Sequence, residues 1–426
     1  MVQIEDHPSR YALANELHAR PFPSLAAPAH AAFLALKRQG VNGAQDRAED
    51  LAHLIQLLDR FGAPHPQPDA THYFGDLGPF RLKWESHTEF VTYTAFVGGV
   101  ADRPFDKAAM DVFPQDWLAD APGLRITSAL VRIEEMPTEQ ELAERFASWF
   151  VSESLVVSHV LDAAAVIAGD FRIDAGGNTR FAVFVDPATG PRRVGRIVQR
   201  ICEIETYKTM SMLGLERARR MGGRLAQIEA ALEELTGDMA SQATAADETL
   251  SALLAIASEL ESLLAQSSFR FSATRAYEAI VVQRVEVLRE ARFEGRQTIR
   301  EFMMRRFDPA MRTVAATEAR LNAMSSRAAR AGDLLRTRVD VERSAQNQEL
   351  LASMDRRADT QLRLQRTVEG LSVVAISYYA VNLASYALYP LAASAGLSKP
   401  MTTAALTPAV ILAVFLLVRR IRRAMK

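Results

Sequence analysis

The chain of 426 residues is long enough for two or three folded units, each able to bury a core. Its 50 basic and 51 acidic residues leave a formal charge of -1, so the charge balance gives no reason to expect nucleic acid as a partner. The single cysteine, Cys202, excludes an intramolecular disulfide and a cysteine-based metal cluster, which indicates a reducing compartment. The N-terminus, MVQIEDHPSR, carries early acids and no long apolar run, so we expect no secretory signal and a largely cytoplasmic chain.

Residues 1–195 predict a cytoplasmic α+β domain with a mostly antiparallel sheet. Strand-like stretches rich in Phe, Thr, Tyr and Val occur in PFRLKWESHTEFVTYTAFVGG, LRITSALVRIEEM and TRFAVFVD. The stretch GDFRIDAGGNTRFAVFVD predicts a hairpin, in which residues 175–178 supply positive-φ turn positions. Three segments between the strands predict helices: residues 31–40, 45–61 and 138–154. The last of these opens with Thr138 and Glu141 at capping-box spacing.

The stretch WESHTEF is the best candidate for a site in this domain. Strand alternation would place Glu85, His87 and Glu89 on one face and Trp84 and Phe90 on the other. A histidine between two carboxylates could hold a divalent cation or act as a general base, although the pattern also fits an ordinary polar strand face. The chain contains no P-loop, GxSxG, GxGxxG or HExxH motif. We therefore expect no enzyme activity and no cofactor, apart from a divalent cation at these three residues.

Residues 196–369 predict a helical bundle and a stalk. Glu, Arg, Ala and Leu dominate the segment, and apolar residues repeat at 3,4 spacing, which is typical of coiled-coil packing. The pattern breaks at residues 236–238, near residues 267–268 and at Asp308-Pro309. An aspartate cap and a first-turn proline at the last break predict the start of a final helix. Its soluble part would be about 90 Å long, and both self-association and a solvated face fit its surface pattern.

Residues 370–426 predict a transmembrane hairpin with a basic C-terminal tail. Two segments, residues 371–393 and 401–418, are free of charge and reach the ~18–20 residues that a membrane helix needs. Arg363 and Arg366 precede the first segment, and RRIRRAMK follows the second. Basic flanks mark the cytoplasmic side, so both termini are expected in the cytoplasm and the short loop SAGLSKP outside. The alternative is a buried helical hairpin in a soluble protein.

A polar stripe runs along the first membrane segment. Tyr378, Asn382, Ser385 and Tyr389 follow i, i+4, i+7 and i+11 spacing and therefore share one helix face. Polar groups in hydrocarbon need partners, so this face predicts an interhelical contact or the wall of a pore. We also expect a homo-oligomer that forms through the stalk and the hairpin. Neither segment contains an acid or a base, which disfavours proton relay and charge-coupled transport.

Five stretches carry a resemblance to a known family: HPSRYALANELHARPFPSLAAP, FRLKWESHTEF, DFRIDAGGNTRF, VQRICEIETYK and LSVVAISYYAVNL. Together they resemble an uncharacterised bacterial domain-of-unknown-function family of predicted membrane-anchored proteins. The resemblance implies an anchor in the bacterial inner (cytoplasmic) membrane and assigns no activity. The architecture is also similar to CorA-type magnesium channels, pentamers whose first membrane helix lines the pore. Their Gly-Met-Asn signature is absent, and the nearest stretch, residues 380–382, falls in mid-helix.

Two functions follow from these observations. The first is a non-enzymatic, oligomeric scaffold or regulator that faces the cytoplasm and is anchored in the membrane. The alternative is a CorA-like oligomeric ion channel or transporter, in which Asn382 and Ser385 line the pore. A membrane-bound enzyme that uses Glu85 and His87 ranks below both.

Overall fold

The computed structural model describes residues 4–11, 13–14, 22–38, 47–241, 245–396 and 398–424. The chain divides into two compact units, Met1–Gly332 and Asp333–Lys426. The first unit contains the sheet and the helices that pack on it, and the second contains the C-terminal hairpin. The long helices begin at Pro191, close to the domain boundary predicted at residue 195, whereas residue 369 lies inside an unbroken helix.

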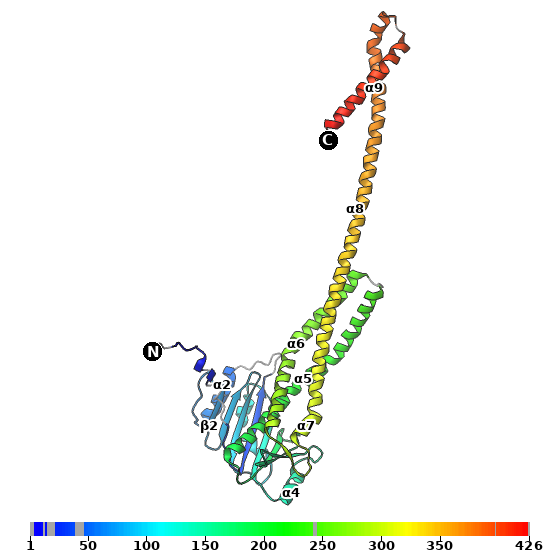
Figure 1. Ribbon diagram of the computed structural model, residues 1–426. Helices are drawn as coiled ribbons and strands as arrows, with labels where there is room; N and C mark the ends of the chain where they lie inside the picture. Colours follow the sequence, from blue (N-terminus) through cyan, green and yellow to red (C-terminus); the bar gives the residue numbers. More distant parts are fainter. Residues whose placement is uncertain are drawn as a thin grey trace. The chain divides into compact units, whose positions relative to one another are not determined.

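One mixed sheet forms the centre of the first unit (Figure 1). In the part of the chain that the structure describes, its nine strands lie in the order β2-β3-β4-β1-β5-β8-β7-β6-β9. Neighbouring strands are antiparallel except for β5 and β8, which run parallel, so the predicted α+β class with a mostly antiparallel sheet is confirmed. In sheet order the strands are His72–Asp76, Arg81–Ser86, Phe90–Gly98, Ala29–Lys37, Leu124–Glu135, Thr179–Val185, Ala165–Gly169, Val156–Val160 and Ala291–Arg292.

The strand β1, Ala29–Lys37, corrects the prediction of a helix over residues 31–40. It pairs along its whole length with β4 on one side and β5 on the other. Both of its faces are covered, so Phe33 and Leu34 point in opposite directions and are both buried. A strand buried on both faces shows no polar alternation, and its Ala and Leu content favours a helix locally. Pairing with distant strands decided the conformation.

Short helices cover one face of the sheet. They are α2 (Arg47–Arg60), the 3-10 turn η1 (Lys107–Met110), α3 (Gln115–Ala119) and α4 (Glu139–Trp149). A buried cluster joins Leu54 of α2 and Trp117 of α3 to Trp84 of the sheet. The helix predicted over residues 45–61 and the capping box of Thr138 and Glu141 are both confirmed. The predicted hairpin turn is also present, with Gly177 at a φ of 82°.

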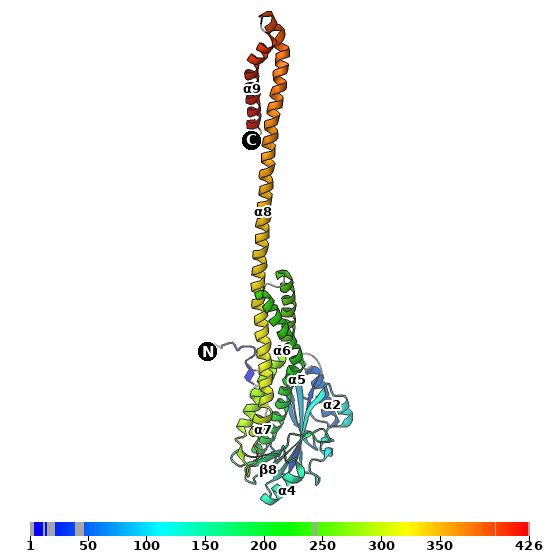
Figure 2. The same ribbon diagram turned by 90° about the vertical axis from the view of Figure 1, so that its right-hand side faces the viewer.

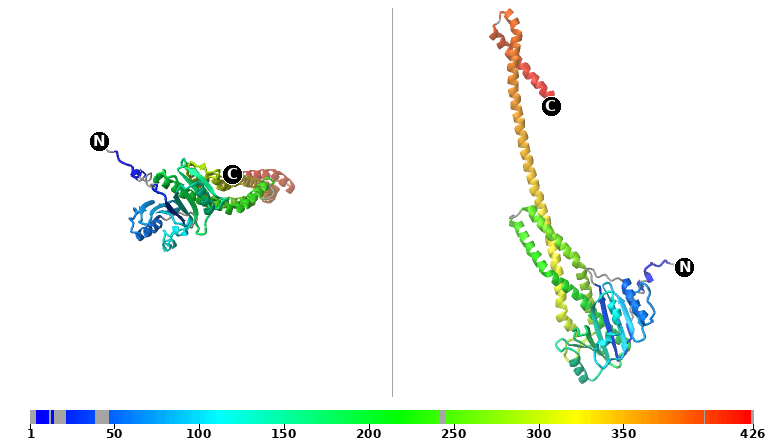
Figure 3. Two further views of the ribbon diagram at one scale, coloured as in Figure 1. Left: turned by 90° about the horizontal axis from the view of Figure 1, so that it is seen from below. Right: turned by 180° about the vertical axis from the view of Figure 1, so that it is seen from behind.

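Long helices cover the opposite face. They are α5 (Pro191–Ser241) and α6 (Ala246–Val287), with the short helix α7 (Ile299–Arg306) beside β6. The helix α8 (Asp308–Ser394) follows α7, and ion pairs join it to α5 and α6. Helices α5 and α6 form an antiparallel pair (Figure 3). The break predicted near residues 267–268 is wrong, because Ser267 is buried inside α6 and accepts a hydrogen bond from Arg217 of α5 at 3.1 Å. The start of the last long helix at Asp308 is confirmed.

The second unit contains the end of α8 and the helix α9 (Lys399–Ala424). Gly396, with a φ of 76°, lies in the turn between them, after which α9 runs back along α8 (Figure 2). Thr402 and Val414 of α9 are buried, which places one face of this helix against α8. Two helical runs, Ile299–Ser394 and Lys399–Ile421, contain segments that are long and apolar enough to cross a membrane.

Candidate functional site

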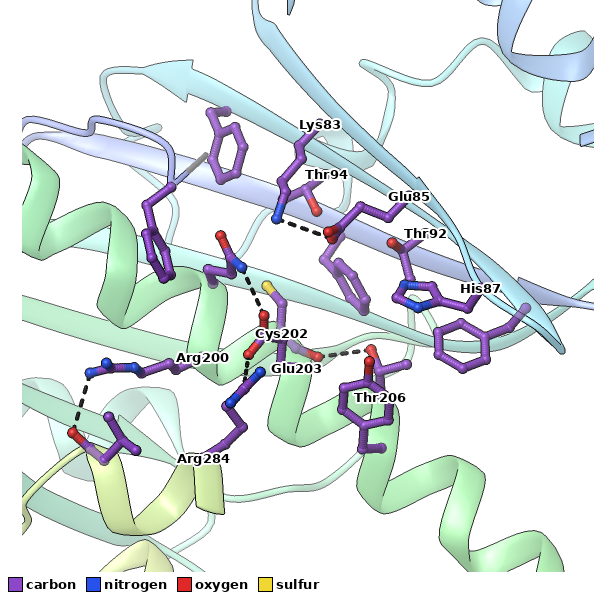
Figure 4. A pocket seen from close by; sticks show the side chains of 17 residues that line it. Lys83, Glu85, His87, Thr92, Thr94, Arg200, Cys202, Glu203, Thr206 and Arg284 are labelled. Carbon is purple, nitrogen blue, oxygen red and sulfur yellow. Dashed lines mark hydrogen bonds and ion pairs between the residues drawn. The ribbon is translucent and has the colours of Figure 1, made fainter. Parts of the chain in front are cut away.

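A cavity of about 260 Å³ lies in the first unit between the sheet and the long helices (Figure 4). We call it the sheet cavity. Strands β1, β3 and β4 form one wall, and helices α5 and α6 form the other. The strand wall includes Phe33, Lys83, Glu85, Thr92, Thr94 and Phe96. The helix wall includes Gln199, Arg200, Cys202, Glu203, Thr206, Tyr207 and Arg284.

Alternation along β3 creates the polar floor of the sheet cavity. Lys83 and Glu85 point into the cavity, whereas Trp84 between them packs in the core on the other face. The register of β3 with β4 sets Thr94 opposite Lys83 and Thr92 opposite Glu85. The ammonium of Lys83 lies 3.1 Å from a carboxylate oxygen of Glu85, and the lysine side chain is only 5% exposed. The two charges therefore balance each other on the buried floor.

On the helix wall, one carboxylate is held by two neighbours. Gln199 Nε2 donates to Glu203 Oε1 at 2.7 Å, and Arg284 of α6 forms an ion pair with the other carboxylate oxygen. Nearby, Arg200 Nη1 donates to the backbone carbonyl of Val287 at 3.2 Å. Burial lowers the pKa of Arg200, and the positive charge of Arg196 acts in the same direction. Contacts within the protein therefore hold these side chains of the helix wall.

Aromatic rings close one end of the sheet cavity. His87 stacks on Phe90 with ring centroids 4.3 Å apart, and Tyr207 of α5 meets His87 edge-on at 6.3 Å. Burial raises the pKa of the Cys202 thiol far above its ordinary range, which favours the neutral thiol over the nucleophilic thiolate. The cavity offers balanced charges, hydroxyls and aromatic rings, a combination that suits binding of a small polar molecule with an apolar part.

The structure brings together two of the three residues predicted as a metal site. Glu85 and His87 line the sheet cavity, but β3 ends at Ser86 and His87 begins the turn to β4, where its N–H donates to the Phe90 carbonyl at 2.8 Å. The predicted common strand face is therefore wrong. Among the described residues, no three His, Cys, Asp or Glu side chains are grouped so that they could hold a metal ion.

Glu89, the third predicted residue, is fully buried away from the sheet cavity. Its carboxylate accepts a hydrogen bond from Tyr277 at 2.9 Å and pairs with Arg270, both of α6. Lys37 at the end of β1 approaches the same carboxylate at 3.6 Å. Glu89 thus joins the β3–β4 turn, β1 and α6 as an ionic link.

A family model described as a protein of unknown function, DUF3422, matches residues 5–425. The chain belongs to the DUF3422 family. This match confirms the resemblance to a domain-of-unknown-function family, and the five stretches that carried it lie within the matched range. Residue 12 and residues 15–21 of the first stretch lie outside the described part of the structure. Neither a curated protein nor a solved structure matches the chain.

Sequence reasoning missed the helix wall of the cavity in this DUF3422 chain. Gln199, Glu203 and Thr206 are spaced i, i+4 and i+7 along α5 and point to one side. The signal was present in VQRICEIETYK, where these polar residues interrupt an apolar run. Without the position of the sheet, this polar stripe could not be distinguished from a solvated helix face.

The polar stripe predicted on the first membrane segment is divided between two environments. Ser385 is buried and Asn382 is half-buried within the second unit. Tyr378 and Tyr389 are exposed, by 66% and 39% respectively. Ser377, one position before Tyr378, is buried instead. Within the single chain, the face of α8 toward α9 therefore includes Asn382 and Ser385, whereas the two tyrosines of the stripe lie outside it.

Proposed function

We propose that the protein is a non-enzymatic regulator anchored in the bacterial inner membrane, with its α+β unit and both termini in the cytoplasm. The observation that carries the proposal is the exposure of apolar side chains in the second unit. Leu371, Val374, Leu383 and Leu391 on α8 are each more than 65% exposed. Exposed apolar surface on this scale is unfavourable in water and favourable in hydrocarbon.

Charge patterning supports the anchor and its orientation. No residue from 370 to 398 carries a charge at neutral pH. Arg363 and Arg366 precede this stretch on α8, and Arg419 and Arg420 follow the apolar part of α9. Positive residues on both flanks of a short hairpin favour cytoplasmic termini.

The sheet cavity supports regulation by a bound small molecule rather than catalysis. Lys83 faces Glu85, and Glu203 is held by Gln199 and Arg284, so these side chains already have partners. A general acid or base needs a proton position that the substrate can reach, and a nucleophile needs activation. Paired charges and a protonated thiol offer neither, whereas they suit recognition.

Two matched substitutions on α8 test the anchor. Leu383 and Leu350 are 69% and 63% exposed, but only Leu383 lies in the charge-free stretch. Arginine costs about 2.5–3.5 kcal/mol near the centre of a membrane helix. We expect Leu383→Arg to lower the fraction of full-length protein that stays in membranes after a carbonate wash, and Leu350→Arg to leave it unchanged. Wild-type protein in the soluble fraction, or a C-terminal reporter outside the cytoplasm, would contradict the proposal.

One observation favours the CorA-like channel as a second candidate. The hydroxyls of Ser377 and Ser385 are buried in the second unit, and neither has a hydrogen-bond partner among the described residues. Polar groups in a membrane need partners, and repacking of α8 and α9 around a water-filled pore or against a second copy of the hairpin would supply them. The second copy also fits the homo-oligomer proposed for the stalk and hairpin.

A further inference from the structure

A second cavity in the first unit has a different chemical character. Its volume is about 670 Å³, and it shares no lining residue with the sheet cavity. It lies where the end of β1 and the start of β5 meet α5 and α6. The lining includes six cationic residues: Lys37, Arg38, Arg125, Arg217, Arg220 and Arg270. We call it the basic cavity.

Among the residues that the structure describes, two arginines of the basic cavity donate hydrogen bonds to neutral acceptors only. Arg217 donates to Ser267 Oγ and to Gln266 Oε1, each at 3.1 Å. Arg125 donates to the backbone carbonyl of Gly176 at 3.4 Å. Neutral acceptors satisfy N–H groups but leave the positive charge in place, so both guanidinium charges remain available to an anion.

Lys37 and Arg270 share a single carboxylate. Glu89 pairs with both, and no part of its side chain is significantly exposed. Burial lowers the pKa of Lys37, and the positive charge of Arg270 adds to this effect while Glu89 opposes it. The single negative charge of Glu89 is therefore shared by the positive charges of Lys37 and Arg270.

The remaining two cations have acidic partners. Arg38 pairs with Glu49, and Arg220 lies 3.5 Å from Glu216, the acidic residue in the lining. Six cations thus face three carboxylates among the residues that the structure describes. The whole chain has nearly equal numbers of acidic and basic residues, so the excess of positive charge at this cavity is a local feature.

We propose that the basic cavity binds the phosphate group of a small anionic molecule. Arginine guanidinium groups recognise phosphate oxygens through paired, charge-assisted hydrogen bonds, and the lining is richer in arginine than in lysine. The volume lies within the range of pockets that hold metabolite-sized ligands. The phosphate can belong to a free phosphorylated metabolite or to a phospholipid headgroup. This inference does not depend on the membrane anchor.

Binding of two probes to the detergent-purified full-length protein tests the proposal. Pyrophosphate represents a free phosphorylated ligand, and dihexanoyl phosphatidylglycerol below its micelle concentration represents a headgroup. We expect Arg217→Gln to weaken binding of the preferred probe about tenfold, because one charge-assisted contact is lost. Arg125→Gln, at an exposed position, should weaken it similarly without disturbing the fold.

Arg219→Gln is the matched control, because Arg219 is exposed on the same helix and does not line the cavity. The Arg219→Gln variant should bind the preferred probe with an affinity within about twofold of wild type, because salt screens the effect of charges outside the site. Tighter pyrophosphate binding would identify a free phosphorylated ligand, and tighter lipid binding a headgroup. Failure of both probes to bind wild type, or equal losses in all three variants, would overturn the proposal.

Discussion

The same helix meets two environments in the two units of this protein. In the first unit, Met311 and Leu321 of α8 are at most 2% exposed. In the second, Leu371 and Leu383 of α8 are 66% and 69% exposed. Neighbouring helices cover the first pair, and ion pairs such as Arg320 with Glu229 join α8 to α5 there. Burial therefore follows from the neighbours that the chain provides, and the second unit leaves apolar surface exposed within the single chain, which agrees with the proposed membrane anchor.

Polar groups are buried in both units. In the first unit the buried carboxylate of Glu89 has three partners, from β1 and α6. In the second unit the buried hydroxyls of Ser377 and Ser385 have no partner among the described residues. A buried hydroxyl without a hydrogen bond is unfavourable. The first unit also contains buried polar atoms without a hydrogen-bond partner among the described residues, such as Trp84 Nε1 and Ser86 Oγ. The contrast between the units therefore rests on exposed apolar surface and not on buried polar groups.

The largest effect should come from truncating an aromatic residue in the first unit. Trp117 is fully buried, stacks on His53 at 4.0 Å and donates from Nε1 to the His53 carbonyl at 2.8 Å. Trp117→Ala should lower the free energy of unfolding by about 3–5 kcal/mol. Tyr379→Ala, at a residue 65% exposed in the second unit, should leave it unchanged. Denaturant unfolding in detergent compares them, and equal losses would erase the contrast between the units.

Removing the charge of Glu89 should have the next largest effect. Glu89→Gln leaves Lys37 and Arg270 without a shared counter-ion in a buried site, which should cost about 3 kcal/mol of unfolding free energy. Glu259→Gln is the control, because Glu259 pairs with Arg224 at the protein surface and its loss should change stability little. Similar stability of the two variants would show that the Glu89 link contributes no more than a surface pair.

Stability of the first unit should also depend on pH through His53. Burial lowers the pKa of His53 from 6.5, while Nδ1 lies 2.9 Å from the Tyr93 hydroxyl. Below pH 6.5, His53 therefore binds a proton more readily in the unfolded chain than in the folded chain. The stability that comes from burying the neutral His53 side chain is fully present above pH 6.5. It is lost as the pH falls through the lowered pKa of His53 in the folded chain. The free energy of unfolding should be lower at pH 5.5 than at pH 7.5, and His53→Gln should reduce this difference. An identical difference in the variant would exclude His53 as its source.

Local signals in the sequence were sufficient for part of the fold. The capping box of Thr138 and Glu141 and the glycine turn at Gly177 depend on residues close in the chain, and both were predicted. The strand β1 was mistaken for a helix because its partners lie far along the chain. The short strand β9 was missed because two residues show no periodicity. Nonlocal pairing is what sequence patterns alone do not supply.

The candidate sites show the same limit. Alternation correctly separated Glu85 from Trp84 on β3, but the position of the following turn separated Glu89 from His87. The basic cavity gave no local signal, because Lys37, Arg125 and Arg217 come from three elements and each is surrounded in sequence by ordinary residues. Only the fold reveals that their charges accumulate.

The smallest expected effect concerns Asn382 on α8, and it distinguishes the anchor from the channel. Asn382 is half-buried in the second unit. In the anchor proposal, Asn382→Leu replaces an amide by a side chain that hydrocarbon favours, so membrane retention and a cytoplasmic C-terminal reporter should be unchanged. In the CorA-like alternative, the same substitution should abolish ion flux into liposomes.

Leu383→Ala is a suitable control for that experiment, because Leu383 is 69% exposed within the single chain and carries no polar group. Light scattering corrected for detergent should accompany it, with the mass of the full-length protein measured before and after the Asn382 substitution. A closed ring of about five subunits with flux that only Asn382→Leu removes would replace the anchor by the channel. A monomer or dimer leaves no ring to enclose a pore, and the buried hydroxyls of α8 would then serve contacts between helices.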